Sequence, residues 1–214
     1  MSRSVAELLR AKIGKEVDYG GYHFRRAITM EERLESQRLR YRVFVEEQFI
    51  EPDPSANEIF RDEFDDVSEH FLAYHESGLL IGSTRLVLPS ELGFPTEFLF
   101  EFERPAILRA EMCEFGRLAI SRDHRGGERA PLLGLIKLVY DCSAEHNTPY
   151  IYAFMPRKFI DLLRSLGLVC RILPVFPPGP EVLRRRAPMR GYFEQGEVSP
   201  VVFDRPAVGE MLGA

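Results

Sequence analysis

The stretch Glu114-Phe-Gly-Arg-Leu-Ala-Ile-Ser-Arg-Asp-His-Arg-Gly-Gly-Glu-Arg-Ala-Pro-Leu-Leu-Gly-Leu135 decides the fold of this chain. Its first part lies in a predicted strand, Met112 to Ile120, and its last part opens a predicted apolar helix, Ala130 to Glu145. The loop between them, Ser121 to Arg129, is polar and carries two adjacent glycines. A loop of this kind can present backbone N–H groups to a phosphate, although glycines also serve turns that bind nothing. The stretch therefore predicts a strand, a candidate anion-binding loop and a buried helix.

Further elements are predicted on both sides of this stretch. The strands are Tyr22–Ile28, His70–His75, Leu79–Leu88, Tyr150–Met155, Val169–Val175 and Met189–Glu194, and the helices are Ser4–Lys12, Thr29–Glu46 and Pro156–Gly167. Thr29 and Glu32 have the spacing of a capping box. This order predicts a mixed α/β sheet in a single domain over residues 1–214, with a helical extension at 1–18 and a loose tail at 205–214.

Composition excludes several classes of protein. The 214 residues are 45% apolar and 29% charged, which is ordinary for a soluble globular domain. The net charge of −5 argues against bulk nucleic-acid binding. No apolar run approaches the roughly 20 residues of a membrane span, and the first residues lack a signal-peptide core. The three cysteines have neither disulfide-framework nor metal-ligand spacing. We therefore expect a cytoplasmic protein with no membrane span, no metal site and buried cysteines.

Charge is spread unevenly along the chain. Residues 46–76 hold eleven acids and one base, whereas residues 157–190 hold eight bases and two acids. Either segment is a solvated surface, or the acidic one handles cations and the basic one faces an anionic partner. The candidate basic face consists of Arg157, Lys158, Arg164, Arg184, Arg185 and Arg186.

Four short motifs resemble those of a known family. They are Arg40-Tyr-Arg-Val-Phe44, Asp62-Glu-Phe-Asp65, Gly82-Ser-Thr-Arg85-Leu-Val-Leu-Pro89 and Glu114-Phe-Gly-Arg117. With the strand, loop and helix described above, they make the chain similar to the GNAT acyltransferase superfamily, and within it to the autoinducer synthases. The chain also resembles the N-acyl amino acid synthases and the exosortase-system-associated acyltransferases.

The resemblance implies a three-layer GNAT-like fold, in which helices flank a central mixed, mostly antiparallel twisted sheet. It implies catalytic roles for Glu114 and Arg117. It also implies that the donor is bound by Arg122, Arg125, Gly126, Gly127 and Ala130, and the other substrate by Arg40, Phe44, Asp62, Asp65 and Arg85. Interpretations without a functional role stay open. Glu114 and Arg117 could form a structural ion pair, and Asp62, Asp65 and Arg85 could form a charge clamp. Arg40 could face solvent, and Phe44 could belong to the core.

The implied reaction moves a fatty acyl group from the phosphopantetheine thioester of an acyl carrier protein to the amine of a small acceptor, an amino acid or a related compound. Glu114 would accept the amine proton, and backbone N–H groups of its strand would stabilise the oxyanion. The loop arginines would hold the pantetheine phosphate, and the basic face would receive the anionic carrier. No tightly bound cofactor is expected.

Three departures from the family patterns keep other functions open. Autoinducer synthases carry a Trp six residues after the motif Phe, but this chain has no Trp and has Ile50 there. Glu128 replaces the central glycine of the loop, which disfavours the pyrophosphate of coenzyme A. Leu163 stands where many acetyltransferases have a proton-donating Tyr. The alternatives are an acyl-homoserine-lactone synthase using S-adenosylmethionine, an acyl-CoA-dependent N-acetyltransferase, and an inactive acyl-binding or regulatory module.

Overall fold

A computed structural model describes residues 16–126 and 129–205 of the chain. The described part contains a sheet with the strand order β1-β2-β3-β4-β5-β6-β8-β7. The strands are β1 Glu16–Tyr19, β2 Tyr22–Arg26, β3 Ser68–His75, β4 Leu80–Val87, β5 Met112–Ile120, β6 Tyr150–Pro156, β7 Cys170–Ile172 and β8 Val198–Asp204. All neighbours are antiparallel except β5 and β6, which are parallel. The predicted mixed, mostly antiparallel sheet is therefore confirmed.

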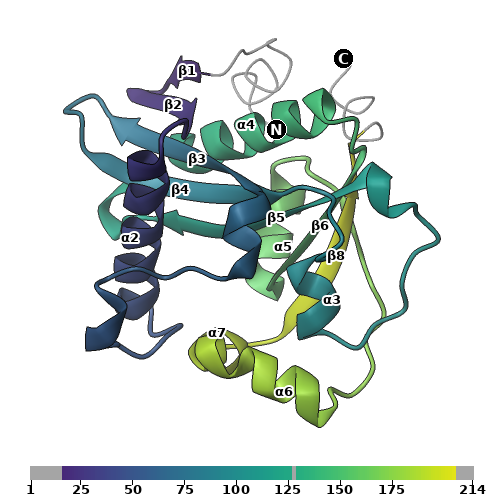
Figure 1. Cartoon of the computed structure of the whole chain (residues 1–214). Coiled ribbons are helices and arrows are strands. Elements are labelled where there is room, and N and C mark those ends of the chain that lie inside the picture. The colour runs from purple at the N-terminus through teal and green to yellow at the C-terminus, as the bar shows by residue number, and fades with distance from the viewer. Residues whose placement is uncertain (1–15, 127–128, 206–214) are drawn as a thin grey trace.

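Helices cover both faces of this sheet, which confirms the three-layer prediction (Figure 1). The α-helices are α2 Met30–Glu46, α3 Pro95–Leu99, α4 Ala130–Glu145, α5 Arg157–Ser165, α6 Pro180–Arg186 and α7 Arg190–Glu194. The short 3₁₀ turns are η1 Pro54–Ala56, η2 Glu63–Val67, η3 Arg109–Glu111, η4 Arg122–His124 and η5 Ala187–Met189. Helices α4 and α5 pack on one face of the sheet, and α2 and α3 pack on the other face. Helix α6 packs against α3.

The two long helices form where their sequences predict them. At the start of α2, the Thr29 hydroxyl accepts from the Glu32 N–H at 3.2 Å, and the Glu32 carboxylate accepts from the Thr29 N–H at 2.8 Å. Helix α4 is buried along most of its length. Gly134 is needed there because the ring of Phe24 occupies the space that a Cβ would fill. The three cysteines are free and buried, as predicted.

The ends of the described chain depart from the predictions. Residues 189–194, predicted as a strand, are helical, and the last strand is β8, which we did not predict. Residues 16–18, predicted to be helical, belong to β1, and residues 1–15 lie outside the described part. Arg205, predicted to begin a loose tail, donates its backbone N–H to the carbonyl of Pro149 at 2.8 Å. The rest of that tail lies outside the described residues.

The sheet opens between β5 and β6. Their pairing covers only Met112–Glu114 on β5 and Tyr150–Tyr152 on β6. Both strands continue further, β5 to Ile120 and β6 to Pro156. Because the strands are parallel, it is their carboxyl-terminal parts that are not paired with each other, and the backbone there faces a gap between β5 and β6. This gap positions the candidate site.

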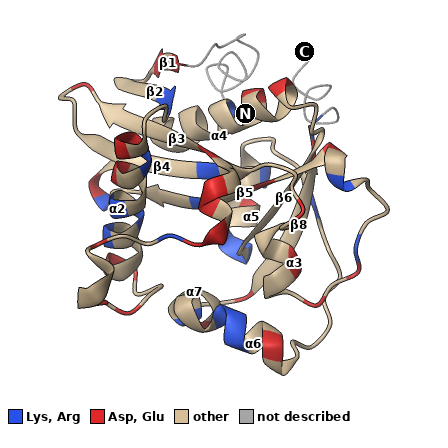
Figure 2. Cartoon of the chain, in the orientation of Figure 1, with Lys and Arg blue, Asp and Glu red and all other residues tan. Residues whose placement is uncertain are grey.

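Charged residues of both signs are mixed on the outer helices. Figure 2 shows basic and acidic segments next to each other on α2 and on α6. Within residues 16–126 and 129–205, no helix has the length and apolar character needed to cross a membrane.

Candidate active site

A bulge in β5 brings Glu114 and Arg117 to the same face of the sheet. Residues three apart in a regular strand point to opposite faces. Here the register with β4 shifts between Ser83 and Arg85, and Arg117 has a left-handed backbone with a φ of 57°. A non-glycine residue in this conformation is typical of bulges and of functional sites. The bulge therefore explains how a Glu-x-x-Arg motif on a strand can act as one unit.

Five side chains on that face form a connected network, which we call the buried cluster: Arg40, Asp62, Asp65, Arg85 and Arg117. Asp65 accepts from two Arg40 nitrogens at 3.0 Å, and its Oδ1 lies 2.9 Å from Arg85 Nη1. Asp62 accepts from Arg85 at 2.5 and 2.9 Å and from Arg117 at 2.7 Å. Arg40 and Arg85 are almost completely buried. The residues predicted to bind substrate thus meet in the fold, and the clamp interpretation describes most of their contacts.

The electrostatics of the buried cluster favour a nearby anion. Burial raises the pKa values of Asp62 and Asp65, but the adjacent guanidinium groups outweigh this effect, so both pKa values are lowered and both groups are charged. Burial lowers the pKa of Arg40 to about 10, which still leaves it charged at neutral pH. Three guanidinium groups therefore face two carboxylates, and the buried cluster has one positive charge in excess.

Glu114 lies beside the buried cluster without being part of its ion pairs. Its Oε2 accepts from the backbone N–H of Thr96 at 2.9 Å, and its Oε1 has no hydrogen-bond partner among the described residues. Burial raises the pKa of Glu114 to about 8. The ion pair that we considered between Glu114 and Arg117 is not formed, because Arg117 pairs with Asp62. A carboxyl group that titrates near neutrality suits proton transfer.

Two adjoining cavities form a groove along the open end of β5. The outer cavity, of about 280 Å³, has its polar wall at Glu47, His124, Arg125 and Arg129. The inner cavity, of about 210 Å³, lies in the gap between β5 and β6, and its lining includes Phe44, Gly116, Arg117, Phe154, Met189 and Tyr192. Phe49, Leu118 and Phe159 line both cavities. The groove therefore leads from the loop before α4 to Arg117.

Arg125 of the predicted donor loop lines the outer cavity, whereas Arg122 does not, and glutamates at the end of α2 contact both arginines. Arg125 donates to Glu47 Oε1 at 2.8 Å, and Arg122 donates to the same oxygen at 3.0 Å. Arg122 Nε also lies 3.3 Å from Glu46. We call these four residues the loop cluster. Unlike the buried cluster it is in contact with solvent, since the Arg122 side chain is 62% exposed.

The remaining residues of the predicted donor loop occupy different environments. Gly126 is exposed, with open space where a Cβ would stand. Ala130 is the first residue of α4 and is buried. Gly127 lies outside the described residues. The helix start is preceded by Arg129, which has a left-handed backbone and lines the outer cavity.

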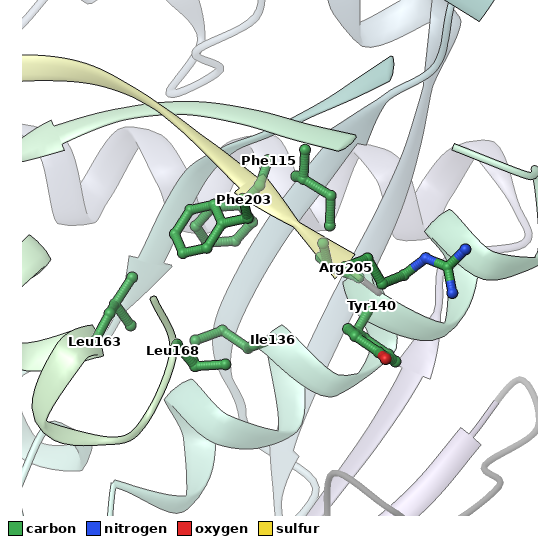
Figure 3. Close-up of a pocket in the computed structure, with 9 residues that line it drawn as sticks. Phe115, Ile136, Tyr140, Leu163, Leu168, Phe203 and Arg205 are labelled. Atoms are coloured by element: carbon green, nitrogen blue, oxygen red, sulfur yellow. The ribbon is translucent and has the colours of Figure 1, made fainter. Parts of the chain in front are cut away.

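A smaller apolar pocket of about 50 Å³ lies between the sheet and the helices α4 and α5 (Figure 3). Its lining includes Phe115, Ile136, Val139, Leu163, Leu168 and Phe203. Figure 3 shows Phe115 and Phe203 close together, with Tyr140 and Arg205 on the other side of the pocket. Phe115 also lines the inner cavity, so this residue adjoins both spaces.

Several groove residues were missed by reasoning from the sequence. Phe49 lines both cavities, whereas Ile50, the position of the expected Trp, is buried in the core. Tyr192 packs edge-on against Phe49 with ring centroids 5.0 Å apart. Gly191 lies so close to the carbonyl of Gln48 that a Cβ would overlap it. The glycine within residues 189–194 could have indicated a close approach of two backbone segments, but we predicted a strand there and did not consider it.

The six residues of the predicted basic face do not form one surface. Three lie on α5 and three on α6, and these helices pack on opposite faces of the sheet. Arg184 and Arg185 both pair with Glu181. Arg186 is held between the rings of Phe100 and Phe193, 4.6 and 4.5 Å from their centroids. Arg186 therefore fastens α6 to the rest of the fold.

Residues 16–126 and 129–205 contain no group of three or more His, Cys, Asp and Glu side chains arranged to hold a metal ion. His70 is fully buried beside the buried cluster, with its Nε2 3.5 Å from Asp65 Oδ1. Burial lowers the pKa of His70 to about 4, so the ring is neutral at physiological pH. His70 is thus a packed core residue.

Solved structures share this architecture. The structure of TofI in a ternary complex with an inhibitor and MTA matches with a TM-score of 0.64 and 17% identity, over 91% of this chain and 97% of TofI. BjaI, a CoA-dependent acyl-homoserine lactone synthase with SAM and isopentyl-CoA, matches with a TM-score of 0.60 and 22% identity, over 86% and 83% of the two chains. FeeM, an N-acyl amino acid synthase from uncultured soil microbes, matches with a TM-score of 0.58 and 15% identity, over 89% and 94%.

The sequence itself matches a family model. No curated protein sequence matches this chain. The model of the N-acyl amino acid synthase FeeM, however, matches residues 35–166, which is more than half of the chain and spans both charge clusters and β5. The structural matches confirm the predicted GNAT-like fold. The chain belongs to the FeeM family of N-acyl amino acid synthases and is an acyltransferase.

Proposed function

We propose that this enzyme transfers a fatty acyl group from the phosphopantetheine thioester of an acyl carrier protein to the amine of an amino acid. The observation that carries the proposal is the groove, which connects the arginines before α4 to Arg117 through the gap between β5 and β6. A groove of this shape suits a long, narrow donor with a charged outer end and an apolar inner end.

The donor would occupy the outer cavity and the gap. Arg125 and Arg129 supply cations for its phosphate at the outer end. The pantetheine arm is built of amides, and the free backbone edges of β5 and β6 are suited to hydrogen-bond it, as one strand bonds another. The thioester would then lie near Gly116 and Arg117, where β5 is bulged.

The acyl chain would continue from the gap into the apolar pocket of Figure 3. Phe115 lines both spaces, so the acyl chain would pass this residue on its way into the pocket. An apolar chain in this pocket gains roughly 0.8 kcal/mol for each methylene group removed from water. Leu163, which replaces the acetyltransferase Tyr, fits this use because it adds apolar surface to the pocket.

The acceptor would bind on the α7 side of the inner cavity. Arg117 uses one terminal nitrogen for Asp62, and its other contacts the sulfur of Met189, a weak acceptor. A carboxylate is a much better partner for a guanidinium group than a thioether. The excess positive charge of the buried cluster acts in the same direction. An amino acid would therefore be oriented by its carboxylate at Arg117.

The chemistry then needs one proton acceptor. The acceptor nitrogen attacks the thioester carbon, the carbon–sulfur bond breaks after the tetrahedral intermediate, and the sulfur leaves as a thiolate. Glu114 takes the proton of the amine through a water molecule and returns a proton to the thiolate, so it ends the cycle in its initial state. Backbone N–H groups of β5 at the gap would stabilise the oxyanion.

The test is an acyl-transfer assay with purified enzyme. The enzyme is mixed with an acylated carrier protein and a set of amino acids, and products are identified by mass spectrometry. We expect N-acyl amino acids, with far less product from Glu114→Gln. Transfer from acyl-coenzyme A but not from the carrier would overturn the proposed donor. An acyl lactone formed only with S-adenosylmethionine would overturn the proposed acceptor.

A further inference from the structure

Glu47 connects the end of α2 to the loop before α4. Its carboxylate accepts from Arg125 at 2.8 Å and from Arg122 at 3.0 Å through one oxygen, Oε1. The same side chain lines the outer cavity, as Arg125 does. Its backbone carbonyl accepts from the side-chain amide of Gln195 at 2.6 Å. Glu47 is therefore held in place from two sides, with its charge directed at the loop arginines.

This carboxylate contacts the same guanidinium groups that would bind a donor phosphate. Arginine binds carboxylate and phosphate through the same N–H groups, so one guanidinium face cannot fully serve both. Although burial opposes the effect, the hydrogen bonds from the two arginines lower the pKa of Glu47, and the carboxylate is charged at neutral pH. The side chains of Glu47 and Arg125 are partly exposed, at 23% and 35%, so water screens their contact and a phosphate can displace the carboxylate.

We propose that Glu47 sets the donor affinity of this enzyme by competing with the donor phosphate for Arg122 and Arg125. This inference rests on the proposed function, because it assumes a donor that carries a phosphate at the outer cavity. A donor held only by its phosphate binds more weakly, since binding must first break the Glu47 contacts. A donor that also fills the groove with its pantetheine arm and acyl chain compensates for this cost.

The adjacent residue provides a matched control. Glu46 is also at the end of α2 and also contacts Arg122, with a separation of 3.3 Å. It does not contact Arg125 in the described hydrogen bonds and does not line the outer cavity. Glu46→Gln and Glu47→Gln change the net charge by the same amount. A difference between them therefore reports the position of the carboxylate and not the total charge.

The experiment measures binding of 4′-phosphopantetheine, and of pantetheine without the phosphate, by calorimetry. We expect Glu47→Gln to bind 4′-phosphopantetheine about 3- to 10-fold more tightly than the unmodified enzyme. Glu46→Gln should change this affinity by less than about 2-fold, and pantetheine should bind equally to all three proteins. Glu47→Ala should repeat the gain, and thermal unfolding checks that each variant is folded.

Other results would overturn the proposal in distinguishable ways. Equal binding of 4′-phosphopantetheine to the unmodified enzyme and to Glu47→Gln would exclude the competition but leave the proposed donor intact. An equal gain with pantetheine would show that Glu47 acts through the shape of the cavity. If 4′-phosphopantetheine binds to none of the proteins, both the competition and the proposed donor site fail. Acyl transfer by the unmodified enzyme is measured separately, so that a failure of the competition can be distinguished from a failure of the proposed function.

Discussion

The buried cluster and the loop cluster use the same chemistry for different purposes. Each joins arginines to carboxylates across distant parts of the chain. In the buried cluster Arg40 and Arg85 have almost no contact with water, so removing one partner leaves an unpaired buried charge. In the loop cluster the Arg122 side chain is 62% exposed, so water or a ligand can replace a lost partner. Burial therefore decides which ion pairs hold the fold and which can be exchanged for substrate.

The first prediction concerns the stability of the buried cluster. Asp65→Asn should lower the free energy of unfolding by about 3–5 kcal/mol, because it leaves Arg40 buried without its carboxylate. Asp66→Asn is the matched control, since Asp66 pairs with Arg61 in the same segment but both side chains are more than half exposed. It should cost less than about 1 kcal/mol. Urea unfolding of both variants measures the difference.

The pH dependence of stability follows from the same cluster. The pKa values of Asp62 and Asp65 are lowered in the folded protein. Their contribution to stability is therefore complete above the usual aspartate pKa, and it is lost as the pH falls below it.

If Asp65→Asn and Asp66→Asn were equally stable, the buried pairs would not hold the fold, and the contrast between the clusters would fail.

The second prediction concerns Glu114, which is buried but unpaired. Glu114→Gln should reduce turnover by about 10²-fold or more, with little change in the KM for the acceptor, because a proton acceptor is lost and not a binding surface. In the unmodified enzyme, turnover should rise with pH as Glu114 loses its proton, with a midpoint near its pKa of about 8. Turnover rates measured from pH 6 to 9, in the pre-steady state or the steady state, would show this rise. The rise should be absent in Glu114→Gln.

The pH dependence of the free energy of unfolding provides a second test of the Glu114 carboxyl group. The pKa of Glu114 is raised by burial in the folded state, so its protonated form stabilises the fold. That contribution is complete below the usual glutamate pKa and declines as the pH rises towards 8. Glu114→Gln should remove the decline. A variant that retained both full turnover and this decline would show that Glu114 has neither role.

The third and smallest effect belongs to the loop cluster. Arg125→Ala should raise the KM for the acylated carrier about 3- to 10-fold and weaken its dependence on salt, because one cation at the outer cavity is lost. Arg157→Ala is a suitable control, since Arg157 is an exposed arginine on α5 that pairs with Asp161. A KM that is the same for both variants over a range of ionic strength would remove Arg125 from the donor site.

Local patterns in the sequence predicted much of the fold. The capping box of α2, the apolar run of α4 and the strand β5 depend on short-range chemistry, and each formed within its predicted range. Strand β8 was missed because Pro200 lies inside it. Helix α7 was taken for a strand because its aromatic residues favour strands locally, whereas packing of Tyr192 against Phe49 determines its position.

The candidate site was only partly predictable for a related reason. Motif spacing indicated which charged residues to select, and the fold brings them together. Spacing does not tell whether Arg40 contacts substrate or only Asp65, because that depends on the position of η2 over the sheet. The contact of Glu47 with the loop arginines joins residues 75 and 78 positions apart, which no local pattern encodes. Long-range contacts of this kind require the three-dimensional structure.

The strand order also bears on how the chain is synthesised. β8 lies between β6 and β7, although both of these strands precede it in the sequence. A nascent chain that has not yet reached Val198 therefore has an unpaired edge on β6 and no partner for β7, and open edges of this kind favour aggregation. Helix α7, which carries Tyr192 at the inner cavity, comes just before β8. The acceptor side of the groove is thus completed only after α7 has been synthesised, shortly before β8 can pair with β6 and β7.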